Sequence, residues 1–190
     1  MNNKDMIIDK TIEMIENNPE GLKNITIREI AKECNIAVGL VNYYFTSKDD
    51  LIAESISKII NGIIKRFGEL KDEMEGLTPF DKLHKLGCIT LDYLFEHYQI
   101  SRISILHDMS NPKLLDNFSR TLGAYIPLVK EIKPNLSDEE VKALSFTLVT
   151  TMQQSFIRHV NIKMLLDLDL TVKEDRYKYH RMMIKQILGE

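Results

Sequence analysis

The sequence has only two cysteines and no apolar run that approaches the roughly 20 residues of a membrane span. Cys34 and Cys88 lie in apolar helical patterns with no metal-type spacing between them, so neither is expected to form a disulfide. This usage of cysteine indicates a reducing compartment. The N-terminus also lacks an apolar run of signal-peptide length, and we therefore expect a cytoplasmic protein.

Catalytic motifs are also missing, because no Ser/His/Asp, P-loop, Rossmann or metalloprotease spacing occurs. No strand pattern with a period of two persists, whereas signals that begin helices recur along the chain. We expect an all-α protein of about nine helices that is not an enzyme and uses no cofactor.

The segment from Thr26 to Leu51, TIREIAKECNIAVGLVNYYFTSKDDL, has the pattern of a helix-turn-helix. Thr26 and Glu29 form a T-x-x-E capping box, which predicts that a helix begins at about Ile27. Apolar side chains at i, i+3, i+4 and i+7 give this helix one buried face, made of Ile27, Ile30, Ala31 and Cys34. The small Ala31 would let a second helix cross closely.

A turn and two further helix starts complete this segment. The turn runs from Asn35 to Ala37, and asparagine tolerates the left-handed conformation that closes a helix. A short helix is then predicted from Val38 to Phe45, with Val41 and Tyr44 facing inward and Leu40, Asn42 and Tyr43 facing outward. Ser47 caps a third helix that begins at Lys48.

These residues resemble the N-terminal domain of TetR-family transcriptional regulators. The resemblance is carried by T-x-R-E-I-A, Ile36, Gly39, the Tyr-Tyr-Phe triplet and S-K-D-D-L. The chain departs from the family pattern at Cys34-Asn35, where Ala-Gly is common, at Ala37, where Ser or Thr is usual, and at Asn42, where Tyr is frequent. The resemblance implies a DNA-binding head over residues 1–47 and an effector-binding and dimerisation body over residues 48–190.

The resemblance assigns DNA contacts to the helix-turn-helix and the helix start after it. The expected DNA-binding residues are Thr26, Arg28, Ala37, Val38, Leu40, Asn42, Tyr43 and Lys48. Tyr43 and Lys48 are expected to contact phosphates, in preference to roles as a packed aromatic and a solvated lysine. Asn42 could read adenine through its amide or contact only the DNA backbone, and both readings stay open.

Charge counts against nucleic-acid binding. The formal net charge is −3, and residues 1–50 hold six Lys/Arg against nine Asp/Glu. Phosphate contacts need only a few well-placed cations and donors, however. The head can therefore still bind DNA if its acidic side chains, Asp5, Asp9, Glu13 and Glu16, lie on the far side of the first helix.

In the body, helix starts are predicted at Thr78-Pro79, Ser101, Asn111-Pro112, Ser137 and Thr171. The helix from Lys48 is expected to reach about Glu75, and the helix from Ser137 about Val160. Apolar stripes mark the last two helices: Val141, Leu144, Leu148, Met152 and Phe156, then Tyr177, Ile184, Ile187 and Leu188. Such a pair can form a four-helix bundle with its two-fold copy or be ordinary core. The resemblance favours a homodimer through these helices.

Two groups of side chains could bind ligands in the body. The resemblance places an effector among the middle helices, near Leu91, Phe95, Met109, Phe118, Met152 and Phe156. Gln153 and Gln154 could point into such a cavity or lie exposed at the edge of the bundle. His84 and Cys88, at i and i+4, could present two metal ligands, but with no third ligand in view a packed cysteine and a surface histidine are favoured.

The resemblance thus implies a dimeric transcriptional repressor that a small, largely apolar effector releases from a palindromic operator. Its expected partners are double-stranded DNA, the effector and a second copy of the chain. Two alternatives stay open. The acidic head and Asn42 suggest a helical small-molecule-binding protein without operator recognition, and the pair of His84 and Cys88 suggests a metal sensor.

Overall fold

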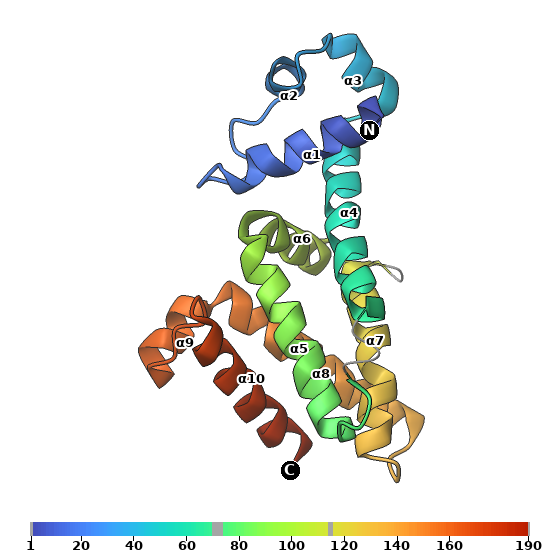
Figure 1. Ribbon diagram of the computed structural model, residues 1–190, viewed down its shortest axis with the longest axis vertical. Coiled ribbons are helices and arrows are strands. Elements are labelled where there is room, and N and C mark those ends of the chain that lie inside the picture. Colours follow the sequence, from blue (N-terminus) through green and yellow to red (C-terminus); the bar gives the residue numbers. More distant parts are fainter. Residues whose placement is uncertain (1, 70–73, 114–115, 190) are drawn as a thin grey trace. The chain divides into compact units, whose positions relative to one another are not determined.

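A computed structural model describes residues 2–69, 74–113 and 116–189, and within these ranges the chain is all-α with ten helices (Figure 1). The helices are α1 (Asn3–Glu16), α2 (Ile27–Glu33), α3 (Val38–Tyr44), α4 (Lys48–Glu69), α5 (Pro79–Glu96), α6 (Tyr98–Ser110), α7 (Asn117–Ile132), α8 (Asp138–Ile157), α9 (His159–Leu166) and α10 (Lys173–Leu188). None of the described helices is both long and apolar enough to cross a bilayer.

The chain forms two compact units. The first consists of Met1–Lys65 with His97–Ser104, and the second of Arg66–Glu96 with Ile105–Glu190. This division by compactness differs from the functional boundary predicted at residue 47, because most of α4 belongs with α1 to α3. The functional boundary itself stays a prediction.

The first unit encloses a core of apolar side chains, most of them from α1 to α4. Its buried members include Ile7, Ile8, Ile15, Ile30, Val41, Phe45, Leu51, Ile52 and Ile100. Two ion pairs join α1 to α4, Lys4 with Glu54 at 2.7 Å and Asp9 with Lys58 at 2.5 Å. The start of α6 joins this unit because the Glu16 carboxylate accepts the N–H groups of Gln99 and Ile100.

The second unit packs α5, α7, α8 and α10 around one core. Its fully buried members include Leu83, Leu91, Tyr125, Val129, Leu148, Val149, Met152, Phe156 and Ile184. The Tyr125 hydroxyl donates to Thr90 Oγ1 at 3.4 Å, and burial raises the pKa of this phenol. Asp92 of α5 accepts hydrogen bonds from Arg176 and Tyr177 of α10, which fixes these two helices against each other.

The apolar stripes of the last two long helices belong mainly to this core. Leu148 and Ile184 are buried inside the chain's own second unit. Of the two interpretations that the sequence left open for these stripes, ordinary core therefore holds for these side chains. The reason is that α8 and α10 pack against each other and against α5.

One helix more is present than the nine predicted. The helix expected to reach Val160 ends at Ile157, because Arg158 leaves the helical conformation, with φ −107° and ψ 27°. The chain then resumes as α9, a separate helix. Neither glycine nor proline marks this break in the sequence, so the local pattern offered no signal for it.

Three other helix starts differ from their predictions. The expected start at Asn111-Pro112 is wrong, since α7 begins at Asn117 with Asp116 accepting the Ser119 N–H at 2.8 Å. The expected start at Ser101 is wrong as well, because α6 begins at Tyr98. The expected start at Thr171 lies slightly too early, because the Thr171 hydroxyl donates to Asp169 and α10 begins at Lys173 with Val172 as its N-cap. The predicted end of α4 near Glu75 cannot be compared, because residues 70–73 lie outside the described residues.

Candidate nucleic-acid interface and effector cavity

The first helix of the helix-turn-helix begins as its capping box predicts. The Glu29 N–H donates to Thr26 Oγ1 at 3.2 Å, and the Thr26 N–H donates to Glu29 Oε2 at 2.8 Å. Both bonds satisfy donors that the first turn of a helix leaves unpaired. Ile30 and Ala31 of α2 are buried, so this helix packs through the face that its spacing indicated.

The turn after α2 depends on Asn35. Its backbone has φ 53°, the left-handed conformation that asparagine adopts at moderate cost. The Ile36 N–H donates to the Ala31 carbonyl at 3.0 Å, which closes the end of α2 in the manner of a Schellman motif. The chain can therefore reverse and enter α3 within three residues, as the sequence predicted.

The second helix, α3, has a buried side and an outward side. Val41 is fully buried and Tyr44 is half-buried, whereas Asn42 is exposed and Tyr43 is 78% exposed. The Tyr43 ring stands edge-on to Tyr44, with centroids 5.1 Å apart. A hydroxyl and an amide thus project from one short helix, which suits hydrogen bonding to phosphates and base edges.

The start of α4 adds a cation beside the helix-turn-helix. Ser47 Oγ accepts the Asp50 N–H at 3.0 Å, which confirms the predicted cap. The Lys48 ammonium donates to the Leu22 carbonyl at 3.2 Å, so it is held in place and still has two N–H donors for a further acceptor.

All eight predicted DNA-binding residues lie in the first unit. Thr26, Arg28, Ala37, Val38, Asn42 and Tyr43 are exposed, and Leu40 and Lys48 are half-buried. Ala37 departs from the family pattern with a physical consequence, because it supplies no side-chain acceptor to cap α3. DNA contact by these eight residues stays a prediction.

Several carboxylates of the acidic N-terminal segment have partners within the first unit. Asp9 pairs with Lys58, Glu13 with Lys10, and Glu16 caps the start of α6. Their charge is therefore partly neutralised inside the unit and is not all presented to a ligand.

Residues 7–55 match the model of a family described as bacterial regulatory proteins, tetR family. The match covers the helix-turn-helix and the start of α4. The matched family is one of regulatory proteins rather than enzymes, which agrees with the prediction from the sequence.

Individual relatives agree with this assignment. A transcriptional regulator of the helix-turn-helix type from Staphylococcus aureus is 31% identical over 97 residues, 50% of this chain and 49% of that protein. A probable regulator of the same type from Bacillus subtilis, YttP, is 27% identical over 99 residues, 52% of this chain and 47% of that protein. The matched part of the chain thus spans about half the length of these relatives.

The fold is shared along nearly the whole chain. The crystal structure of a TetR-like transcriptional regulator from a Rhodococcus species superposes with a TM-score of 0.66 over 98% of this chain and 93% of that one. Its sequence identity is 13%, so this likeness concerns the fold alone.

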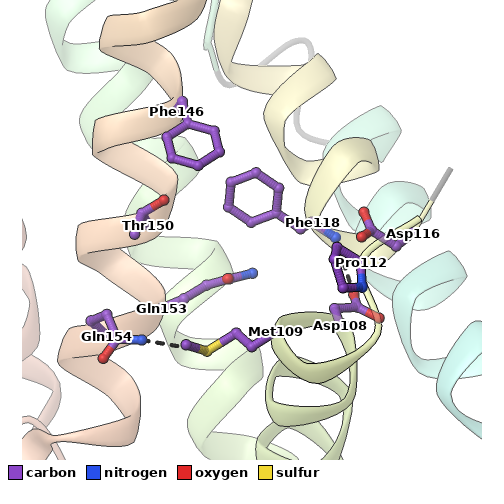
Figure 2. A pocket seen from close by; sticks show the side chains of 9 residues that line it. All are labelled: Asp108, Met109, Pro112, Asp116, Phe118, Phe146, Thr150, Gln153 and Gln154. Atoms are coloured by element: carbon purple, nitrogen blue, oxygen red, sulfur yellow. Dashed lines mark hydrogen bonds between the residues drawn. The ribbon is translucent and has the colours of Figure 1, made fainter. Parts of the chain in front are cut away.

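The second unit contains a cavity of about 280 Å³ (Figure 2). It lies between α8, the start of α7 and the end of α6. Its lining residues are Asp108, Met109, Pro112, Asp116, Phe118, Phe146, Thr150, Gln153 and Gln154. The Phe118 and Phe146 rings meet edge-on with centroids 5.1 Å apart and form an apolar wall.

Polar groups give this cavity hydrogen-bonding capacity. Thr150 Oγ1 is buried and has no hydrogen-bond partner among the described residues. The Asp108 carboxylate accepts the N–H groups of Asn117 and Phe118, while burial, and then the nearby Asp116, raise its pKa above the usual range. An apolar wall beside an unpaired hydroxyl suits a small, mostly apolar molecule with a polar group.

Two of the six predicted effector-binding residues, Met109 and Phe118, line this cavity. Leu91, Met152 and Phe156 are buried core side chains, and Phe95 packs edge-on to Phe156 at 5.0 Å. Sequence reasoning did not select Asp108, Pro112, Asp116, Phe146 or Thr150. The pair of glutamines on an apolar helix was the available signal, since Gln153 and Gln154 both line the cavity.

Proposed function

We propose that this protein is a DNA-binding transcriptional regulator that inserts α3 into the major groove of an operator. The observation that carries the proposal is the exposure of Asn42 and Tyr43 on the outward side of α3, within the segment that matches the TetR family. In this proposal Tyr43, Lys48 and Arg28 bind phosphates, and Asn42 contacts a base or the backbone. Such a regulator acts on the bacterial chromosome and therefore in the cytoplasm.

The active form in this proposal is a homodimer built on the outer surfaces of α8 and α10 together with α9. Support comes from α9, where Val160, Met164, Leu165 and Leu166 are 46 to 79% exposed. A run of such side chains in water is unfavourable, and a second copy would cover it. A two-fold dimer would read a palindromic operator whose half-sites lie about 34–36 Å apart, or slightly more.

An effector in the cavity beside Phe118 and Phe146 would control DNA binding, most simply as release of a repressor. Thr150 and Gln153 would bind its polar group, and the two rings would hold its apolar part. By linkage, a ligand that prefers the conformer unable to bind DNA lowers DNA affinity, and DNA lowers ligand affinity by the same factor, typically about 5 to 150-fold.

A mobility-shift experiment with the DNA that flanks the protein's own gene tests this function. A specific complex that withstands excess random DNA is the expected result. The protein could instead bind small molecules, as judged by thermal stabilisation, and shift the mobility of neither the flanking DNA nor random DNA. In that case it is a helical small-molecule-binding protein. If stabilising ligands leave the affinity for a confirmed operator unchanged, the cavity does not control DNA binding.

A further inference from the structure

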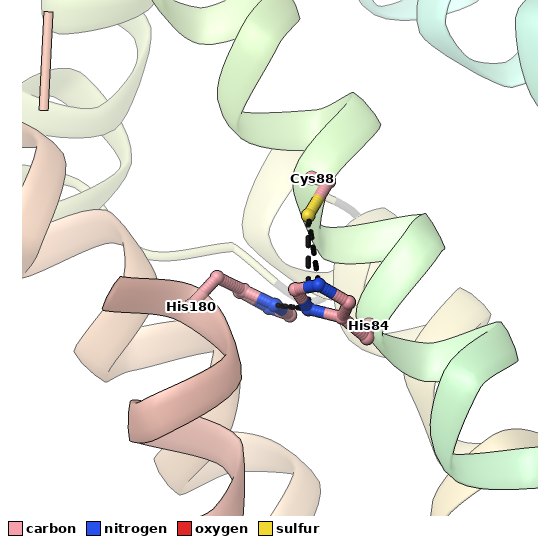
Figure 3. Close-up of side chains that lie close together, drawn as sticks. All are labelled: His84, Cys88 and His180. Carbon is pink, nitrogen blue, oxygen red and sulfur yellow. Dashed lines mark hydrogen bonds between the residues drawn. The ribbon is translucent and has the colours of Figure 1, made fainter. Parts of the chain in front are cut away.

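Three side chains with metal-binding atoms converge between α5 and α10 in the second unit (Figure 3). His84 and Cys88 lie one turn apart on α5, and His180 reaches them from α10. The Nδ1 atoms of the two imidazoles are 3.0 Å apart, and Cys88 Sγ is 3.7 Å from His84 Nδ1. One ligand atom from each residue lies within 4.8 Å of the other two.

These separations are close to those of a metal site. A tetrahedral ion with nitrogen ligands at about 2.0–2.1 Å and sulfur at about 2.3 Å places its donor atoms about 3.3–3.6 Å apart. The two separations that involve His84, 3.0 and 3.7 Å, differ from these values by a few tenths of an ångström. The third pair, His180 with Cys88, lies within 4.8 Å, so these two side chains would have to adjust to admit an ion.

The protein alone does not meet the hydrogen-bonding needs of His180. The side chain is fully buried, and its Nε2 has no hydrogen-bond partner among the described residues. This atom lies against Gly87, where there is no room for an ion. The nitrogen of His180 that is available to a metal is therefore Nδ1, which faces His84 Nδ1 at 3.0 Å.

The neighbouring charged groups are already engaged. Asp92, one turn beyond Cys88, accepts hydrogen bonds from Arg176 at 2.8 Å and from the Tyr177 hydroxyl at 2.6 Å. Arg181 pairs with Asp81 at 3.1 Å. The three converging side chains thus form the ligand set, and a fourth position remains for water or another small ligand. His84 is half-buried, which gives an ion a route of entry from its side of the cluster.

We propose that His84, Cys88 and His180 bind a late first-row transition-metal ion, such as Zn²⁺, that joins α5 to α10. One thiolate and two imidazoles prefer such ions over Mg²⁺ and Ca²⁺, which take oxygen ligands. The site is separate from the helix-turn-helix and from the cavity beside Phe118. The proposal therefore does not depend on DNA or effector binding.

Metal titration of the full chain tests this site. The protein is first treated with a chelator and a thiol reductant, and is then titrated with Zn²⁺ against a chromophoric chelator and separately with Co²⁺. One ion per chain is expected, and the Co²⁺ complex should show the near-ultraviolet charge-transfer absorption of a thiolate ligand. Cys88→Ser should abolish this absorption. His84→Gln should weaken Zn²⁺ binding by more than about 100-fold. Loss of a residue that only hydrogen-bonds to a metal ligand costs up to about 100-fold, and loss of a ligand itself should cost more.

Matched controls come from residues of the same type outside the cluster. Cys34→Ser and His107→Gln should leave both the stoichiometry and the absorption unchanged. Because His180 is fully buried, the half-buried His84 supplies the deciding histidine variant, with its fold checked by circular dichroism. Wild-type protein that binds no Co²⁺ or Zn²⁺ would overturn the proposal. So would a folded Cys88→Ser or His84→Gln protein with wild-type Zn²⁺ affinity, which would identify the cluster as packed core.

Discussion

The imidazole of His180 lies directly against the backbone of Gly87. A β-carbon added at Gly87 would lie 1.9 Å from His180 Nε2, closer than any unstrained contact. Since His180 is fully buried, its ring has little room to retreat. The glycine in the middle of α5 is therefore required by the close approach of α10.

Gly87→Ala is expected to destabilise the protein despite the better helix propensity of alanine. Overpacking costs about 1–3 kcal/mol, against a propensity gain of about 1 kcal/mol, so a net loss of up to about 2 kcal/mol is expected. Gly123→Ala in α7 is the control, because nothing lies within 4 Å of a β-carbon there and the site is exposed. In urea denaturation, the free energy of unfolding should fall for Gly87→Ala and rise for Gly123→Ala. Equal stabilisation by both substitutions would contradict the close contact.

Asp92→Ala is expected to destabilise the second unit strongly. The substitution leaves the buried guanidinium of Arg176 without its carboxylate, and breaking a buried pair in this way costs about 3–5 kcal/mol. The control is Asp138→Ala, which removes a 76% exposed carboxylate that pairs with Lys130. This substitution should lower the free energy of unfolding by less than about 1 kcal/mol. Similar midpoints of denaturation for the two variants would show that the Asp92 pair does not hold α5 and α10 together.

Leu165→Lys is expected to dissociate the proposed homodimer without unfolding the chain. Leu165 is 78% exposed on α9, so a lysine there disturbs no core but places a charge in the dimer contact. Leu148→Lys, at a residue that is 1% exposed, should unfold the protein instead. Light scattering with circular dichroism separates these outcomes. A monomeric wild-type protein at micromolar concentration, or a dimeric Leu165→Lys protein, would exclude this interface.

Substitutions on α3 and at the start of α4 should separate phosphate contacts from base contacts. Tyr43→Ala and Lys48→Ala are expected to weaken all DNA sites about equally, and Lys48→Ala should also reduce the salt dependence, with the slope falling by about 1 for the lost cation. Asn42→Ala should change the preferred sequence, at a cost of about 1–3 kcal/mol at one base pair. Binding measurements on operator and random DNA at several salt concentrations distinguish these effects. If Asn42→Ala lowers the affinity for operator and random DNA equally, Asn42 contacts only the DNA backbone.

The helix-turn-helix could be predicted because its signals are local. Thr26 with Glu29 and Ser47 with Asp50 are three residues apart, and each pair forms the expected cap. Asn35 likewise adopts the left-handed conformation that its place after α2 required. Hydrogen bonds that span three or four residues depend mainly on spacing, so residue order by itself determined these elements and their exposed face.

Only the tertiary structure decided the break at Arg158, the lining of the cavity and the assembly of the histidine and cysteine cluster. His84 and Cys88 were visible as a pair on one helix face, but His180 lies 96 residues from His84. Its arrival depends on how α10 packs on α5, through Gly87, Asp92 and Arg176. Such packing is set by the combined burial of many side chains, and no local spacing encodes it.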